Sequence, residues 1–262
     1  MTIVLNSGSK SFSKIFWITA LSVVLAICLS QIPATSLASL VDSQSACRVV
    51  LHKSIGTIWS GSAAIGFSEP DEVSGSCRVP VALTERFTWK TQCSLMDGRC
   101  LVEMNFVSLH KPLIATISLN QIKIAAGEMT LPASILEALG NPWSTLRPRG
   151  QLMAQWGDLQ KGSDAVGTVR LNINNLSSPI SAVKPLGSYE IKANLAQAGA
   201  SFVIDTTAGP LLLNGKGELG AKDGTGMHFL GSARATPGAE DSLIGLLSLL
   251  GKKDGDIYRM QY

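Results

Sequence analysis

The chain has few of the residues from which catalytic and metal sites are built. Only 16% of its 262 residues are charged, and its three histidines, His52, His110 and His228, lie far apart and outside any metal-binding pattern. It has no Gly-x-Ser-x-Gly elbow. Gly215-Lys216-Gly217 lacks the spacing and the following Ser or Thr of a phosphate-binding loop. We therefore predict a protein that is not an enzyme and has no catalytic, metal-binding or cofactor-binding residues.

An excess of charge of one sign is also missing. The formal net charge is +3, and Lys and Arg form no run that could follow a phosphate backbone, so we predict no binding to nucleic acid. Low charge combined with 25 glycines and many short runs of strand-forming residues is typical of a β-dominated fold. At this length the chain can build one large domain or two small ones.

The longest apolar run lies near the N-terminus. Lys10 and Lys14 precede Ile15–Leu29, and positive charge before an apolar run places the N-terminus in the cytoplasm. The run is shorter than the ~20 apolar residues that a membrane-spanning helix needs. The small residues of Ser36-Leu37-Ala38 would also suit cleavage of a signal peptide. A membrane anchor and a signal peptide thus both remain open, and both put the chain from about residue 40 outside the cytoplasm.

Cysteine usage agrees with an oxidising compartment. Cys28 lies within the apolar run and is interpreted as a small hydrophobic residue. The others form an even set of disulfide candidates: Cys47, Cys77, Cys93 and Cys100. Of the three pairings we favour Cys47–Cys77 with Cys93–Cys100, because Asp97-Gly98 inside the second loop is a strong hairpin signal. A zinc site is the alternative, but no C-x-x-C pair is present and no histidine lies close in sequence.

Short runs of strand-forming residues, bounded by turns or polar breaks, fill most of the remaining chain. They cover residues 48–52, 62–65, 78–92, 101–107, 113–119, 122–124, 150–156, 166–173, 189–195, 201–206, 210–213, 215–219 and 227–233. This pattern predicts a mainly β fold, an extended, curved antiparallel sheet with one or two short helices. The stretches 47–130 and 150–235 are similar in outline, which suggests two similar halves.

Two further segments have helical spacing. One is Pro132–Leu139, with Gly140 as its C-cap. The other is the Leu-rich Ala239–Leu250, which we interpret as a helix buried against the sheet, with a partner-binding helix as the alternative. Residues 251–262 are polar and are predicted to form a flexible tail.

The stretch Gly56-Thr57-Ile58-Trp59-Ser60-Gly61 is predicted to be one short strand edged by glycines. Thr57, Ile58 and Trp59 favour strands, and Trp59 can bury more area than its neighbours, which makes it a candidate core anchor. Nothing in the stretch can bind a metal or act as a nucleophile well. We therefore predict a structural role for Gly56, Trp59 and Gly61.

Several such stretches occur together along the chain. In order they are the N-terminal apolar segment, Gly56–Gly61, Gly150-Gln151-Leu152 leading to Trp156, Ser178-Pro179-Ile180-Ser181 with Pro185-Leu186-Gly187-Ser188-Tyr189, Gly209-Pro210-Leu211-Leu212-Leu213-Asn214-Gly215, and Leu246-Leu247-Ser248-Leu249-Leu250-Gly251-Lys252-Lys253. In these pieces the chain resembles the type II secretion system protein N (general secretion pathway protein N) family over nearly its whole length. Pro185, Gly187 and Tyr189 join the predicted structural motif on this ground.

The resemblance implies a single-pass inner-membrane protein with a cytoplasmic N-terminus and a periplasmic β-domain. It implies a non-enzymatic component of the inner-membrane platform that supports export of folded proteins across the outer membrane. The implied partners are platform proteins C, L and M, with a homodimer as a further candidate. The family supplies no catalytic residues and no cysteine pattern, so the disulfide prediction rests on spacing alone.

The resemblance also favours an uncleaved anchor, which completes the predicted organisation. Residues 1–11 are cytoplasmic, 12–32 form a transmembrane signal-anchor, 33–46 a linker, 47–250 the periplasmic domain and 251–262 the tail. The alternative function is a periplasmic β-sheet carrier or scaffold for lipids or other hydrophobic ligands, because a curved sheet with an apolar inner face could hold acyl chains.

Overall fold

The computed structural model describes residues 9–45, 49–67, 81–94, 96–107, 109, 111–139, 143–162, 165–196, 199–220 and 227–261. Its helices are α1 (Ser9–Ser30), α2 (Ala34–Gln44), the 3₁₀ helix η1 (Ala133–Leu139), α3 (Trp143–Leu146) and α4 (Glu240–Leu250). The first half of the strands comprises β1 (Val49–Gly56), β2 (Ser60–Phe67), β3 (Val81–Ser94), β4 (Arg99–Asn105), β5 (Leu113–Ser118), β6 (Gln121–Ile124), β7 (Gly127–Pro132) and β8 (Arg149–Trp156). The second half comprises β9 (Leu159–Lys161), β10 (Ala165–Ser177), β11 (Gly187–Ala196), β12 (Gly199–Ala208), β13 (Leu211–Leu219), β14 (Met227–Ala235), β15 (Lys252–Asp254) and β16 (Ile257–Gln261).

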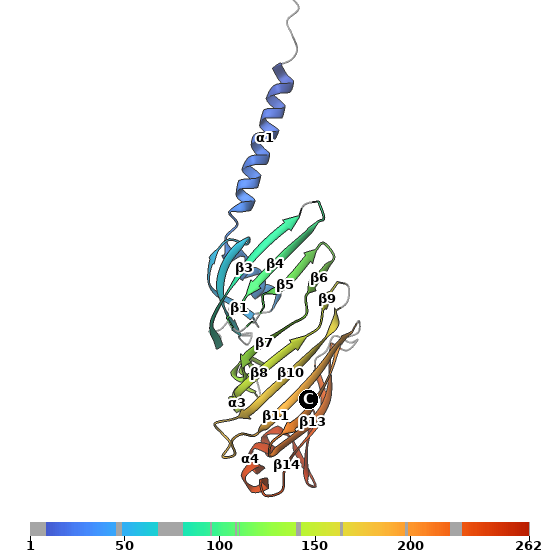
Figure 1. Ribbon diagram of the computed structural model, residues 1–262. Coiled ribbons are helices and arrows are strands. Elements are labelled where there is room, and N and C mark those ends of the chain that lie inside the picture. Colours follow the sequence, from blue (N-terminus) through green and yellow to red (C-terminus); the bar gives the residue numbers. More distant parts are fainter. Residues whose placement is uncertain are drawn as a thin grey trace, which may run out of the picture.

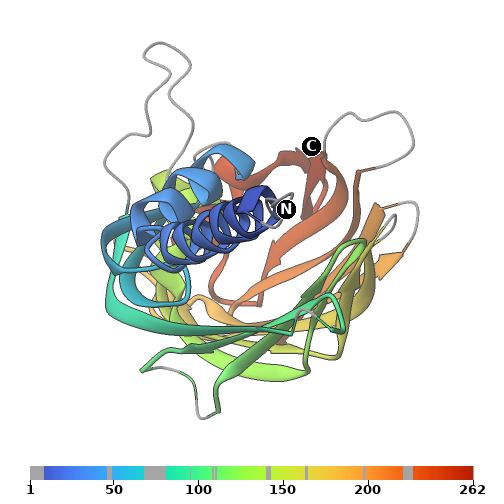
Figure 2. The same ribbon diagram turned by 90° about the horizontal axis from the view of Figure 1, so that it is seen from above.

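The strands of the described residues form one antiparallel sheet, in the order β1-β2-β3-β4-β5-β6-β9-β10-β11-β12-β13-β14-β16-β15. The long strand β10 pairs with β9 near its start and with β8 further along, and β7 pairs with β8. The sheet is tall and curved: seen from above, its strands follow an arc and not a flat row (Figures 1 and 2). The prediction of a mainly β, antiparallel fold with few helices is therefore confirmed.

Three hydrophobic clusters lie on the face of the sheet that carries the helices. Near β1–β3, Ala34 of α2 packs with Ala63, Phe87 and Trp89. In the lower half, Ala133 of η1 packs with a cluster that includes Ile173 and Tyr189. At the far end, α4 supplies four buried leucines to the largest cluster: Leu243, Leu246, Leu247 and Leu250. The interpretation of 239–250 as a helix buried against the sheet is thereby confirmed.

The N-terminal helix extends away from the sheet (Figure 1). It is 22 residues long, and the side chains of Phe16, Trp17 and Leu21 are exposed. In the part of the chain that the structure describes, no helix reaches the length and hydropathy of a membrane span. The transmembrane anchor predicted over residues 12–32 therefore stays a prediction.

Three local predictions need correction. The region 33–46, predicted as a linker, contains α2, because Ala34 and Ala38 give this helix a small apolar face that can approach the sheet closely. The tail is ordered as far as residue 261: β16 pairs with β14, and Tyr258 and Met260 are buried, as the alternation from residue 257 to 260 requires. The segment 132–139 is helical as predicted, but as a 3₁₀ helix that begins at Ala133.

The stretch from Gly56 to Gly61 is not one strand. Gly56 ends β1, residues 57–59 form the turn, and β2 begins at Ser60. Gly56 has φ +99°, a backbone conformation that residues with a Cβ atom rarely adopt, and this allows the chain to reverse here. Trp59 is half-buried and lies outside the core clusters, so its prediction as a core anchor is wrong.

Candidate functional site: the inner face of the sheet

Side chains on alternate positions point to opposite faces of a strand, so the register of the ladders shows which residues share a face. Val102 pairs with Ala115, which pairs with Ile124, and Ile124 pairs with Leu159. Further along the sheet, Val169 pairs with Ala193, and Ala193 pairs with Phe202. We call the face that these residues share with the three hydrophobic clusters the inner face.

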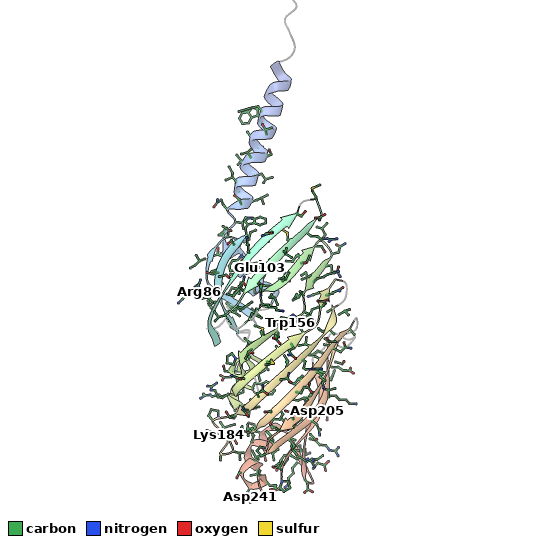
Figure 3. All side chains as sticks on the ribbon, viewed as in Figure 1. Arg86, Glu103, Trp156, Lys184, Asp205 and Asp241 are labelled. Atoms are coloured by element: carbon green, nitrogen blue, oxygen red, sulfur yellow. A yellow bond between two sulfur atoms is a disulfide. The ribbon has the colours of Figure 1, made fainter. Side chains whose placement is uncertain are left out.

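The middle of this face is not covered by any described helix. We call it the open segment, and it consists of Val102, Ala115, Ile124, Leu159, Val169, Ala193 and Phe202. All of these side chains are half-buried except Ala115, which is buried. The neighbouring strands border an open hollow of about 610 Å³. Its lining includes Trp156, Val169, Ala193 and Phe202, together with residues next to them in the chain, among them Arg170 and Lys192. Figure 3 shows Trp156 near the middle of the long axis of the molecule.

Aromatic rings lie flat on the inner face because glycines lie beneath them. A Cβ atom at Gly61 would lie 2.4 Å from the Trp89 ring, and one at Gly127 would lie 2.8 Å from the Trp156 ring. In each case the glycine and the tryptophan are direct cross-strand partners. The glycines therefore leave room for the rings to cover the backbone instead of standing up from the sheet.

The same arrangement recurs at the edge of the open segment. A Cβ atom at Gly217 would lie 2.3 Å from the Phe202 ring, and one at Gly215 would lie 2.6 Å from the Phe229 ring. The two rings are stacked, with centroids 5.9 Å apart and an interplanar angle of 3°. The large side chains thus form a floor, and no described helix lies over its middle.

Four polar side chains on the inner face donate to carbonyls of the chain itself. The Trp89 indole N–H donates to the Thr57 carbonyl (3.1 Å), and that of Trp156 donates to the Ala125 carbonyl (2.9 Å). The hydroxyls of Thr91 and Thr206 donate to the carbonyls of Ile58 and Leu213.

Tyr189 is satisfied in the same way. Its hydroxyl donates to the Leu211 carbonyl at 3.0 Å, and burial raises its pKa above the ordinary value. Among the inner-face positions of β4–β6 and β9–β14 that the structure describes, Lys161 is the one charged residue, and it is exposed at the end of β9. The floor can therefore accept apolar groups but offers no partner for polar or charged ones.

The outer face carries charged side chains among exposed apolar ones such as Leu101, Val166 and Val203. Glu190 accepts from Lys192 at 2.8 Å and lies 3.3 Å from the Arg170 guanidinium. The hydrogen bond from Lys192, together with the positive charge of both neighbours, lowers the pKa of the Glu190 carboxyl. In an antiparallel sheet one face commonly packs on the core while the other faces water. Here no described helix covers the middle of the inner face.

The motif residues predicted from the sequence lie in two separate places. The first group, Gly56, Trp59 and Gly61, is at the end of the sheet next to α1. There the Trp59 indole N–H donates to the Leu29 carbonyl at 2.8 Å, and the Ile58 N–H donates to the Ile32 carbonyl at 3.1 Å. The β1–β2 turn thus supplies donors to carbonyls at the C-terminal end of α1, where a helix leaves such groups unpaired.

The second group surrounds the Tyr189 side chain. Gly187 is buried, and a Cβ atom at Gly209 would lie 2.3 Å from the Gly187 Cα, so the two glycines allow their loops to touch. The Leu186 N–H donates to the Leu176 carbonyl, and Leu186 packs in the same cluster as α4. Pro185 follows a cis peptide bond and is exposed. These residues join loops and core, and no ligand-binding arrangement results from them.

The disulfide prediction is confirmed for one pair. Cys93 and Cys100 are bonded and face each other directly across β3 and β4, with Cα atoms 4.0 Å apart. Cys47 and Cys77 lie outside the described residues. Cys28 is a free, exposed thiol on α1. In the described residues no group of three His, Cys, Asp or Glu side chains could hold a metal ion.

The sequence suggested an apolar inner face as a possible ligand site but not the residues of the open segment. The alternation of apolar residues in each strand was visible, but a single strand does not reveal which residues of distant strands share a row. Only the pairing of the strands shows that Val102 on β4 and Phe202 on β12 lie on the same face.

Comparison with protein families gives one match. The family model described as "Type II secretion system (T2SS), protein N" matches residues 48–260, which cover the whole sheet. No match was found among curated proteins, and none among solved structures.

Proposed function

The chain belongs to the type II secretion system protein N family, and from this premise we propose that it is a non-enzymatic component of the inner-membrane platform of that system. Membership links the chain to type II secretion and to other components of the secretion machinery. We propose platform proteins C, L and M as its partners, with a homodimer as a further candidate assembly. The observation that carries this proposal is the family match over residues 48–260.

We further propose that the sheet lies in the periplasm and that α1 attaches it to the inner membrane. Two observations support this location. The Cys93–Cys100 bond suits an oxidising compartment. The exposed apolar side chains of α1, among them Phe16 and Trp17, suit contact with lipid or with an apolar helix of a partner. Protease treatment of spheroplasts should degrade the sheet, and resistance of the sheet in intact spheroplasts would contradict a periplasmic location.

The motif around Trp59 has a role in this proposal. Since the β1–β2 turn donates to the Leu29 and Ile32 carbonyls, two hydrogen bonds connect the sheet to the end of α1 and the residues just after it, in addition to the covalent chain. A force or displacement at the membrane would then be passed to the sheet through Trp59 and Ile58. We expect Trp59→Phe, which keeps the ring and removes the N–H donor, to loosen this connection without unfolding the sheet.

The experiment is a secretion assay in a strain that lacks this gene. We expect a folded exported protein to accumulate in the periplasm, and the full chain to restore its release into the medium. A chain without residues 9–30 should fail to restore release although its sheet is intact. Unchanged secretion in the deletion strain, with the other platform proteins at normal levels, would contradict the proposal.

A second candidate function is that of a carrier or scaffold for hydrophobic ligands, and the open segment favours it. The middle of an apolar face is normally covered in a soluble domain, and here no described helix covers it. The two functions differ in one observable. A carrier should contain bound lipid even in cells that lack the rest of the secretion system.

A further inference from the structure

We propose that the open segment of the inner face binds the acyl chains of a membrane glycerophospholipid. This inference rests on the second candidate function, and it can fail while the secretion role stands. It starts from the apolar row Val102, Ala115, Ile124, Leu159, Val169, Ala193 and Phe202, which crosses seven neighbouring strands from β4 to β12.

The length of the open segment fits hydrocarbon chains. Neighbouring strands lie ~4.8 Å apart, so seven strands give a row of roughly 29 Å along the sheet. The hydrocarbon core of a bilayer is ~30 Å thick, so a lipid acyl chain, which spans one leaflet, covers about half of that distance. The row is therefore long enough for a whole acyl chain.

The polar groups on this face argue against an extended polypeptide as the occupant. A peptide segment brings backbone N–H and C=O groups that need partners when they are buried. The side-chain donors on this face, such as Thr91, Trp156 and Thr206, already donate to carbonyls of the chain itself. The strands of the floor also use their backbone groups in the ladders with their neighbours. An acyl chain has no polar groups to satisfy.

The curvature of the face argues against a second copy of the chain. Two identical faces that both curve inward touch only at their rims and leave a void between them, whereas protein interfaces are packed nearly as densely as interiors. A flexible chain can instead follow the floor. The flat rings of Trp156 and Phe202 keep that floor low, because Gly127 and Gly217 lie beneath them.

The position of the lipid headgroup follows from the lack of charged residues in the open segment. The open segment contains no charged residue, so a phosphate or carboxylate could not be buried there at an acceptable cost. The headgroup of a glycerophospholipid can remain in water along the open side of the curved sheet (Figure 2). Helix α1 extends from one end of the sheet (Figure 1) and carries exposed apolar side chains, so a membrane that holds this helix would supply lipid at that end.

The test is photo-crosslinking of the full chain in vesicles of phosphatidylethanolamine and phosphatidylglycerol. A small fraction of the phosphatidylethanolamine carries a diazirine near the end of one acyl chain, and adducts are mapped by mass spectrometry after illumination. We expect adducts on inner-face residues such as Val169, Ala193 and Phe202. Their chain neighbours Thr168, Asn194 and Ser201, which point to the outer face, should carry at least tenfold fewer.

A matched pair of variants makes the test specific. Val169→Asp places a charge on the open segment, and Thr168→Asp places the same charge on the exposed outer face one residue earlier. We expect V169D to lower adduct formation on the strands at least tenfold and T168D to leave it unchanged, with equal circular dichroism for both. Adducts on α1 report contact with the vesicle and should be the same in both variants.

Two results would overturn the proposal. One is labelling of α1 without labelling of the inner face, which would show that lipid is available but does not enter the open segment. The other is a protein crosslink in cells. For this experiment photoreactive benzoylphenylalanine replaces residue 193, and a second variant with the same group at residue 194 is the control. A covalent adduct with another protein, such as an amphipathic helix, at residue 193 alone would assign the face to a protein partner. Neither result bears on the secretion assay of the deletion strain.

Discussion

Under α2, at the β1–β3 end of the sheet, Phe87 and Trp89 are only 5% and 4% exposed, whereas Val169 and Phe202 on the open segment of the same face remain half-buried. Both regions follow the same alternation of apolar and polar residues, and both place rings over glycines. They differ in what lies above the floor. A helix fills that space at one end, and none of the described helices fills it in the middle.

The difference separates two kinds of position on one apolar face. At the ends, burial against α2, η1 and α4 stabilises the fold. In the middle, the same kind of side chain is half-buried, and in our proposal it contacts a ligand. Stability measurements on matched residues can therefore separate the structural part of the face from the binding part.

The largest effect is expected for Trp89→Ala. This side chain is fully buried under α2 and donates to the Thr57 carbonyl, so its removal should lower the free energy of unfolding by about 3–5 kcal/mol. Trp156 also lies opposite a glycine, Gly127, and also donates a hydrogen bond to a carbonyl, but it is only half-buried. We therefore expect Trp156→Ala to cost about half as much unfolding free energy as Trp89→Ala. Urea denaturation of both variants checks this difference. Equal losses would mean that the middle of the face supports the fold as strongly as the end.

The next effect concerns the disulfide bond between β3 and β4. A Cys93→Ser, Cys100→Ser double variant should lose roughly 2–3 kcal/mol of unfolding free energy, because the bond closes a loop with a sequence separation of 7. Cys28→Ser, which removes a free thiol on α1, is the control and should have the stability of the parent in the same urea titration. A double variant as stable as the parent would show that the ladder alone holds this hairpin.

The strand pattern of this fold could be predicted from the sequence, because period-two alternation and turn residues are local signals. The hairpin at Asp97-Gly98 and the Cys93–Cys100 bond follow from such signals, since both partners lie within a few residues of each other. Trp59 was misjudged because a large aromatic residue beside strand formers has the same local appearance in a strand and in a turn. Its actual partner, the Leu29 carbonyl, lies 30 residues away.

The open segment could not be predicted for a related reason. Whether Val169 is covered depends on helices elsewhere in the chain, and its neighbour Phe202 is brought beside it only through β11. The ordered tail was missed because β16 is short and polar at alternate positions, and it is stabilised by contact with β14 and α4 and not by its own propensity.

A smaller loss of stability is expected at Tyr189, which packs in the same cluster as Ala133 of η1, at a covered part of the face. Tyr189→Phe removes the hydrogen bond to the Leu211 carbonyl and should cost about 0.5–1.5 kcal/mol at pH 7. Burial raises the pKa of this phenol above its ordinary value of ~10, so the parent should keep its full stability below pH 10 and lose it as the pH rises further. The phenylalanine variant should lack this contribution to the alkaline loss. Denaturation from pH 8 to 11.5 measures both, and parallel curves would refute the assignment to Tyr189.

The smallest effect is expected for Val169→Ala on the open segment. Because the Val169 side chain is half-buried, its truncation should lower the unfolding free energy of lipid-free protein by about 0.5 kcal/mol or less. The control is Ile173→Val on the same strand. It removes one methylene from a side chain that is only 2% exposed, and it should cost ~1 kcal/mol. Bound acyl chains stabilise the folded state only through contacts with the open segment. Added lipid should therefore raise the melting temperature of the parent and of I173V equally, and that of V169A less. If V169A gains as much from lipid as I173V does, the acyl chains do not contact this row.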